Sequence, residues 1–124
     1  MKKLIKIKKL NKAKDIIGYD IEKRGVEQAV RTSNDVMKIV AEYFDLTVGD
    51  LVGKDRHKEI MIPRQICMYL IKNELNHSYE KIGTEFGGRN HTTVMHACNK
   101  TSKQLQKDLK LVKDINAIRR EMGF

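Results

Sequence analysis

The sequence predicts an all-α protein that contains a helix-turn-helix motif, and three observations support this prediction. Apolar residues recur at helical spacing through most of the chain after residue 32, whereas no segment convincingly alternates as a strand would. Proline occurs only once and tryptophan is absent. A double glycine at 87–88 separates two amphipathic segments, as expected for two helices joined by a tight turn. We therefore expect six or seven helices and no strand.

The first long amphipathic segment starts near residue 32, and either Thr32 or Ser33 can cap it. Apolar residues from Val36 to Phe44 recur at i, i+3, i+4, i+7 and i+8, which predicts a helix with one buried face. Next, the segment Thr47–Asp50 resembles a capping box that starts a short helix, and Gly53 ends this helix. Residues 54–59 are polar and aperiodic, so we expect a loop there.

A longer helix follows this loop. Pro63 suits its first turn, because the N–H that proline lacks would be unpaired there in any case. On the inner side we expect Ile66, Tyr69, Leu70 and Asn73, and on the outer side Arg64, Gln65 and Lys72. The segment Asn76-His77-Ser78 then breaks the helix, and Ser78 caps the next one.

The helix-turn-helix motif occupies the stretch after Ser78. Its first helix carries Ile82 and Phe86 at i, i+4, and its second helix starts at the N-cap Asn90. The expected inner positions of the second helix are Val94, Cys98, Thr101 and Leu105. A turn near residues 107–110 leads to a last helix, whose expected core positions are Leu111, Ile115, Ile118 and Met122.

The charge of the chain indicates a polyanionic partner. The formal net charge of the 124 residues is +9, which favours nucleic acid or a membrane surface, although solvated helix faces would also account for many lysines. Residues 1–31 hold ten Lys and Arg against four Asp and Glu, so +6 of the +9 lies there. We expect residues 1–31 to be a basic extension, partly helical or disordered, before a domain over residues 32–124. A membrane-surface helix is the alternative for this extension.

Several classes of protein are disfavoured. No apolar run approaches the ~18 residues that would span a membrane. Cys67 and Cys98 lie in apolar helical patterns without a CxxC pair or a signal peptide, so we expect reduced core thiols in a cytoplasmic protein. The segment Gly49–Asp55 has one residue too few between its glycines for a phosphate-binding loop, and Asp follows its lysine where Ser or Thr is needed.

A zinc site at His91, His96 and Cys98 is equally disfavoured. The two histidines are five residues apart, so on a helix their side chains project about 140° from each other. No fourth ligand is evident. We therefore expect no enzyme activity, no metal and no cofactor.

DNA binding explains more residues than any other function. Thr92 and Thr93 offer methyl and hydroxyl groups to base edges, and His91 can donate to a phosphate. Arg89 lies at the entry of the same helix, where backbone N–H groups also favour anions. We expect Arg64 and Gln65, at the start of the neighbouring helix, to clamp the DNA backbone. We expect Arg56, in the loop before that helix, to enter a minor groove. Ordinary polarity of a helix start is the alternative for Thr92 and Thr93, and solvated charge is the alternative for Arg64 and Lys72.

These residues resemble a known family. The run Gly87-Gly88-Arg89-Asn90-His91-Thr92-Thr93-Val94-Met95-His96-Ala97 resembles the signature of the C-terminal DNA-binding domain of the bacterial replication initiator DnaA. The resemblance extends to Val40-Ala41-Glu42-Tyr43-Phe44, Pro63-Arg64-Gln65 and Asn76-His77-Ser78, and covers about residues 33–120.

The resemblance implies a domain that binds a short A/T-rich DnaA box. By its motif, Arg56 would enter the minor groove. The implied phosphate contacts are Lys58, Arg64, Gln65, Lys72, His91 and Thr92, and the implied major-groove residues are Asn90, Thr92 and Thr93. The chain departs from the family at three positions: Asn90 replaces the usual Asp, Glu80 stands where a proline contact is often found, and Thr101 replaces an aliphatic residue.

The departure at Asn90 leads to an expectation about specificity. An amide has both a donor and an acceptor, which matches the N6/N7 edge of adenine, so we expect a relaxed or adenine-shifted preference at one position of the box. Only a basic segment of 31 residues precedes the domain, and nothing in this segment resembles an ATPase lid. We expect a free-standing box-binding domain that competes with or recruits a full-length initiator, or that regulates transcription. The alternative is an interaction adaptor that docks an acidic partner through its basic extension.

Overall fold

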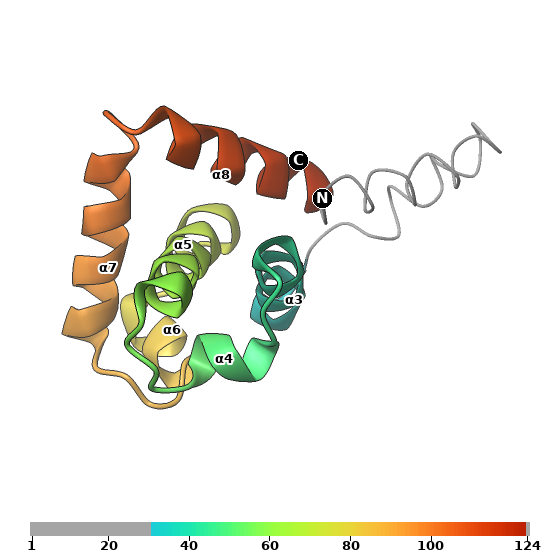
Figure 1. Cartoon of the computed structure of the whole chain (residues 1–124). Coiled ribbons are helices and arrows are strands. Elements are labelled where there is room, and N and C mark those ends of the chain that lie inside the picture. The colour runs from blue at the N-terminus through green and yellow to red at the C-terminus, as the bar shows by residue number, and fades with distance from the viewer. Residues whose placement is uncertain (1–30, 124) are drawn as a thin grey trace, which may run out of the picture.

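The computed structural model describes residues 31–123, and these residues form six helices and no strand (Figure 1). The helices are α3 (Ser33–Phe44), α4 (Val48–Val52), α5 (Lys58–Leu75), α6 (Tyr79–Glu85), α7 (His91–Gln104) and α8 (Leu109–Glu121). The prediction of an all-α fold with a helix-turn-helix is confirmed. Our expectations for residues 1–30 lie outside the described part of the chain.

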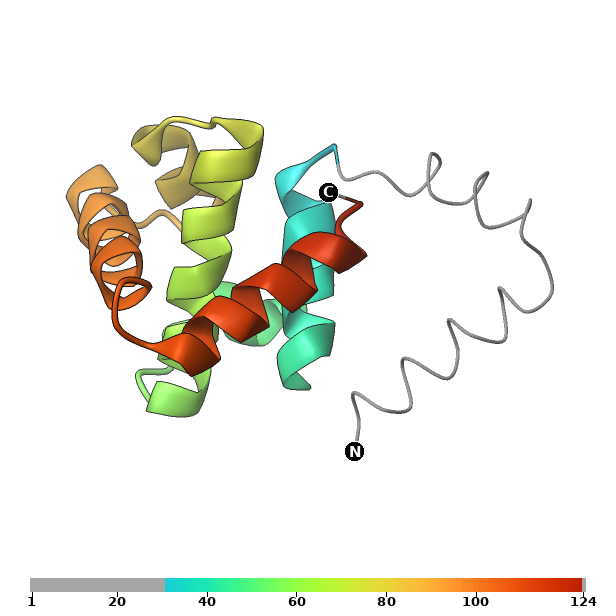
Figure 2. The same ribbon diagram turned by 90° about the horizontal axis from the view of Figure 1, so that it is seen from above.

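Helix α5 is the central element of the fold. It packs against α3, α4, α6 and α7, while α8 closes the remaining side by crossing α3 (Figures 1 and 2). An apolar helix in this position must be buried on more than one face. The sequence of α5 agrees, because Ile66, Cys67, Met68, Leu70 and Ile71 are all buried although they point in different directions around the helix.

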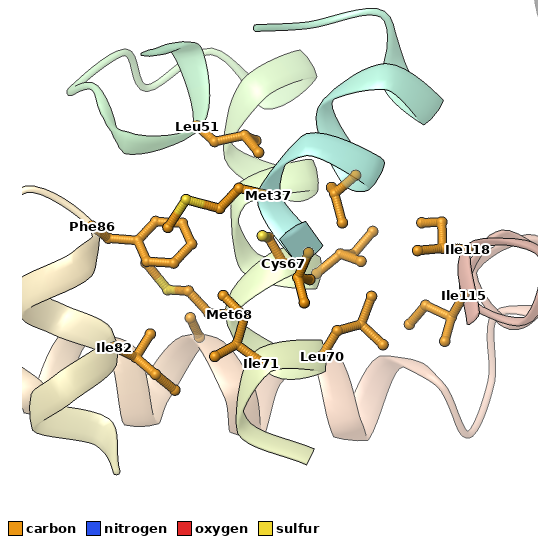
Figure 3. Close-up of a cluster of buried hydrophobic side chains, with 14 of the residues drawn as sticks. Met37, Leu51, Cys67, Met68, Leu70, Ile71, Ile82, Phe86, Ile115 and Ile118 are labelled. Atoms are coloured by element: carbon orange, nitrogen blue, oxygen red, sulfur yellow. The ribbon is translucent and has the colours of Figure 1, made fainter. Parts of the chain in front are cut away.

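The core is continuous from α6 to α8 (Figure 3). Phe86 and Ile82 enter from the helix-turn-helix side, and Ile115 and Ile118 enter from α8 (Figure 3). Between them lies Leu70 of α5, which is fully buried. The expected core positions of the last helix and the inner positions Val94, Cys98 and Thr101 of α7 are therefore confirmed, while Leu105 is half-buried.

Helices α3, α4, α6 and α7 start at predicted capping residues, and of the two candidates at α3 Thr32 is the N-cap. Thr32 and Asp35 form a capping box at α3, and Thr47 and Asp50 form another at α4. The hydroxyl of Ser78 accepts a hydrogen bond from the backbone N–H of Lys81 at the start of α6. Each cap satisfies N–H groups that have no partner inside the helix, so these short polar side chains determine where the helices begin.

Helix α5 differs from its prediction in three ways. It begins at Lys58 and contains Pro63 in its interior, because the carbonyl of His57 accepts the N–H groups of Ile60 and Met61 and so closes a turn ahead of the proline. The expected loop therefore ends at residue 57. Asn73, expected on the inner side, is exposed.

The third difference concerns Arg64. We expected it on the outer side of α5, but it is only 5% exposed. Its burial has a local reason, since α4 and the following loop pack over the start of α5 and place backbone carbonyls around the guanidinium. The outward placement of Arg64 is wrong.

The turn of the helix-turn-helix depends on glycine in two ways. Gly87 and Gly88 have φ values of 78° and 79°, a left-handed conformation that side chains disfavour. Gly83 of α6 has an ordinary helical position, but a Cβ there would collide with the carbonyl of Arg89. These glycines allow the chain to return closely over α6 before α7 begins.

Candidate nucleic-acid interface

The N-terminal end of α7 presents exposed polar side chains. His91, Thr92 and Thr93 form its first turn, and all three are exposed. The Oδ1 atom of Asn90 accepts a hydrogen bond of 2.7 Å from the backbone N–H of Thr92, so Asn90 is the N-cap as predicted. Since the cap uses one of the two lone pairs of this oxygen, Asn90 can present its side-chain NH₂ and the second lone pair to a ligand. The first turn of α7 is thus a polar tip with donors and hydroxyls.

A groove of about 850 Å³ runs beside this tip, between α7 and the start of α5. The loop after α4 and the glycine turn close its ends. Six of its lining residues are basic or can become so, and none of the lining residues in the described chain is Asp or Glu. The six are Lys54, Arg56, Arg64, Arg89, His96 and Lys100. A concave surface with one sign of charge concentrates an anionic ligand.

Arg64 lies at the base of this groove and is bonded to the protein backbone. Its Nε donates to the carbonyl of Leu51 at 2.7 Å, and its two terminal nitrogens donate to the carbonyls of Asp55 at 2.9 Å and Asp50 at 3.0 Å. Burial lowers the pKa of the Arg64 guanidinium, and the nearby charge of Arg89 lowers it further. Both groups stay charged, because the pKa of arginine starts far above neutrality.

Arg89 makes a similar set of contacts from the other side. One terminal nitrogen donates to the carbonyls of Phe86 at 2.6 Å and Val52 at 3.1 Å, and the other donates to the carbonyl of Gly53. Burial lowers the pKa of this guanidinium as well. Two cations expected to meet DNA are therefore hydrogen-bonded to the backbone around the end of α4.

The structure gathers half of the predicted site residues in the groove. Those that line it are Arg56, Arg64, Gln65, Arg89 and Thr93. Those that do not are Lys58, Lys72, Asn90, His91 and Thr92. His91 and Thr92 belong to the polar tip of α7, Asn90 is the N-cap of that helix, and Lys58 is exposed at the start of α5. The ammonium of Lys72 lies 4.6 Å from the ring centre of Tyr79, in a cation–π contact with α6.

Sequence reasoning missed three of the basic residues that line the groove. His96 and Lys100 follow Thr93 at i+3 and i+7, so helical spacing would have placed them on the groove side of α7. Lys54 is two residues before Arg56 in the same loop. His96 and Lys100 could have been found in the sequence, because they are basic residues at helical spacing from the predicted contact residue Thr93.

The loop after α4 contains an exposed ion pair. The Nδ1 of His57 is 2.6 Å from a carboxylate oxygen of Asp55, and the backbone N–H of His57 donates to the same oxygen at 2.9 Å. These hydrogen bonds lower the pKa of Asp55, and the bond to Asp55 raises the pKa of His57. The pair fixes the backbone on the carboxyl side of Arg56.

Two features of residues 31–123 bear on other functions. No group of three or more His, Cys, Asp or Glu side chains in this range is placed to hold a metal ion. None of the described helices combines the length and the apolar character that a membrane span requires. Cys67 and Cys98 are free and buried, and burial raises the pKa of the Cys98 thiol to about 11.

Helices α6 and α7 are joined by a tight glycine turn, and α7 carries an exposed polar tip beside a cationic groove. This arrangement defines a helix-turn-helix protein of the DNA-binding class. Comparison with known families agrees. Residues 33–101 match the family model described as the bacterial dnaA protein helix-turn-helix. Because this match covers more than half of the chain, the chain belongs to that family. The resemblance seen in the sequence is confirmed.

The similar curated proteins are chromosomal replication initiator proteins DnaA. The protein of Limosilactobacillus reuteri is 45% identical over 87 residues, which are 70% of this chain and 20% of that protein. The protein of Lactobacillus delbrueckii subsp. bulgaricus is 46% identical over 84 residues, which are 68% of this chain and 18% of that protein. The protein of Lactococcus lactis subsp. cremoris is 49% identical over 82 residues, which are 66% of this chain and 18% of that protein. The chain thus spans about a fifth of the length of these relatives.

Proposed function

We propose that this protein binds double-stranded DNA sequence-specifically, at A/T-rich sites similar to the DnaA box, and that it acts in the control of replication initiation. One observation carries the proposal: the polar tip of α7 stands beside a groove whose charged lining is entirely cationic among the described residues. Phosphates position a protein on DNA and base edges specify the sequence, so the two features together supply both requirements.

In this proposal α7 enters the major groove and the loop after α4 reaches the adjacent minor groove. Asn90, Thr92 and Thr93 face base edges, and Arg56 enters the minor groove, where A/T-rich tracts attract arginine. The sugar-phosphate strand between the two DNA grooves then lies in the cationic groove of the protein. The proposed phosphate contacts are Lys58, Gln65, Lys72, His91 and Thr92, with Lys54 and Lys100 added because they line that groove.

The biological role that we propose follows from the relatives. They are replication initiators, and this chain matches only about a fifth of their length. A domain that binds the same sites competes with an initiator for them, recruits it, or regulates transcription nearby. We also propose a cytoplasmic, nucleoid-associated location, since the DNA that it binds is there.

Selection of bound sequences from a random duplex pool tests this function. We expect an enriched A/T-rich motif for the intact chain. Arg56→Ala should weaken the enrichment, while Lys113→Ala on the exposed side of α8 removes the same charge and should leave it intact. Binding without any enriched motif would contradict the proposal and would favour the adaptor function instead.

A further inference from the structure

Two arginines from different elements bond to the same short stretch of backbone. Arg64 belongs to α5, and Arg89 belongs to the segment between the glycine turn and α7. Their guanidinium groups donate to five of the six carbonyls of residues 50–55, those of Asp50, Leu51, Val52, Gly53 and Asp55. We refer to this set of hydrogen bonds as the arginine latch.

The latch satisfies a specific need of α4. The last carbonyls of any helix lack partners within it and carry the negative end of its dipole. Here α4 has only five residues, so a large part of its backbone is in this condition. Guanidinium groups are suited to bond to these carbonyls because their donors are arranged in a planar fork, whereas a lysine ammonium offers a single compact charge.

The latch also joins the end of α4 to the turn of the helix-turn-helix. Arg89 donates both to Val52 and, at 2.6 Å, to the carbonyl of Phe86 at the end of α6. A Cβ at Gly87 would lie 3.0 Å from the carbonyl oxygen of Val52, so the turn lies directly against the end of α4. The loop that carries Lys54 and Arg56 therefore starts from a point fixed against the turn that orients α7.

We propose that Arg64 and Arg89 are positioning residues, which hold the Lys54–Arg56 loop in place relative to α7 so that the DNA contacts of the loop and of α7 are energetically coupled. The coupling of DNA contacts rests on the proposed function. The positioning of the loop by the two arginines does not depend on DNA binding. The role differs from the phosphate contact that the resemblance implies for Arg64, because each guanidinium donates three hydrogen bonds within the protein.

Substitution of arginine by lysine distinguishes these roles. A lysine keeps the charge and would preserve a simple phosphate contact, but its three donors sit on one nitrogen and cannot span the carbonyls that the separate nitrogens of a guanidinium reach. Arg89→Lys is the main variant, because Arg89 is half-buried and a lysine head can reach solvent. Arg120→Lys on α8 is the matched control, since Arg120 is exposed and distant in the fold from the latch.

The first measurement needs no DNA. Amide hydrogen exchange of the intact chain reports local opening segment by segment. We expect Arg89→Lys to speed exchange at least tenfold at the hydrogen-bonded amides of residues 50–57, which include Asp50, Leu51 and His57, and to leave the core amides of α5 unchanged. Unchanged exchange at these amides would overturn the latch, as would an equal increase throughout the chain, which would mean general destabilisation.

The second measurement is a double-mutant cycle on the duplex that the random pool selects. We expect Arg89→Lys to weaken binding at least fivefold in the parent but less than twofold in an Arg56→Ala background, because the loop then has less to contribute. Equal losses in both backgrounds would overturn the coupling. If the parent binds no duplex, the proposed function fails, and the exchange measurement still decides whether the arginine latch positions the loop.

Discussion

Two groups of cations line the same groove and differ in what they bond to. Arg64 and Arg89 are hydrogen-bonded to backbone carbonyls, whereas Lys54, Arg56 and Lys100 are exposed and donate no hydrogen bond to the residues that the structure describes. The first group stabilises the arrangement of the elements. The second group is available to an anionic ligand. A basic residue in a nucleic-acid groove is therefore not by itself evidence of a contact with nucleic acid.

The largest effect on stability is expected when a member of the hydrogen-bonded group is removed. Arg64→Ala should lower the free energy of unfolding by about 3 kcal/mol, because three hydrogen bonds from a charged donor are lost and buried carbonyls are left without partners. Urea denaturation without DNA measures this. Lys54→Ala at the exposed rim is the control and should change the unfolding free energy by less than about 0.5 kcal/mol. Equal stability of the two variants would remove the distinction between the groups.

Substitution in the exposed group should affect binding instead of folding. Arg56→Ala should weaken binding to the selected duplex by about 1–3 kcal/mol and reduce the slope of log K against log[salt] by about 1, because one cation near the phosphates is lost. The free energy of unfolding should not change. Titrations at several salt concentrations measure both quantities, with Lys113→Ala as the control. A fall in stability equal to that of Arg64→Ala would show that Arg56 belongs to the bonded group.

A smaller effect is expected at the tip of α7. The cap bond uses one of the two lone pairs of the Asn90 amide oxygen, so the NH₂ donor and the second lone pair remain for the N6/N7 edge of adenine, as expected from the sequence. Asn90→Asp keeps the cap but offers an acceptor, which should shift the preference toward cytosine by about 1–2 kcal/mol.

Titrations with all four bases at each position of the selected site test this shift. Asn90→Ser is the control, because serine also caps a helix but lacks the amide. It should flatten the base preference without creating a new one. Identical base profiles for the parent, Asn90→Asp and Asn90→Ser would reduce the role of Asn90 to that of a cap.

The smallest expected effect is a pH dependence in the loop. The bond to Asp55 raises the pKa of His57, and the bonds to His57 lower the pKa of Asp55. The pair therefore stabilises the folded protein at pH values between the pKa of Asp55 and the pKa of His57. This stabilisation is lost as the pH falls through the lowered pKa of Asp55, and also as the pH rises through the raised pKa of His57. Exposure keeps the effect small. An NMR titration should show a lower His57 pKa in Asp55→Asn than in the parent.

The amino-acid sequence determined the local structure of this protein. Thr32, Thr47, Ser78 and Asn90 begin helices because their side-chain oxygens satisfy N–H groups only two or three residues away. The glycine turn at 87–88 is local in the same sense, since its φ values exclude most other residues. Interactions across so few residues are visible in sequence, and so the helix-turn-helix and its family were identified correctly.

The tertiary structure decided the roles of the arginines. Whether Arg64 reaches solvent or a carbonyl depends on where residues 50–55 pack, and no local pattern states that packing. The same holds for Arg89, whose partners Val52 and Gly53 precede it by 37 and 36 residues. A charge can be counted in the sequence, but the backbone oxygens that bond it are brought together only by the fold, because every residue carries such an oxygen and only packing selects among them.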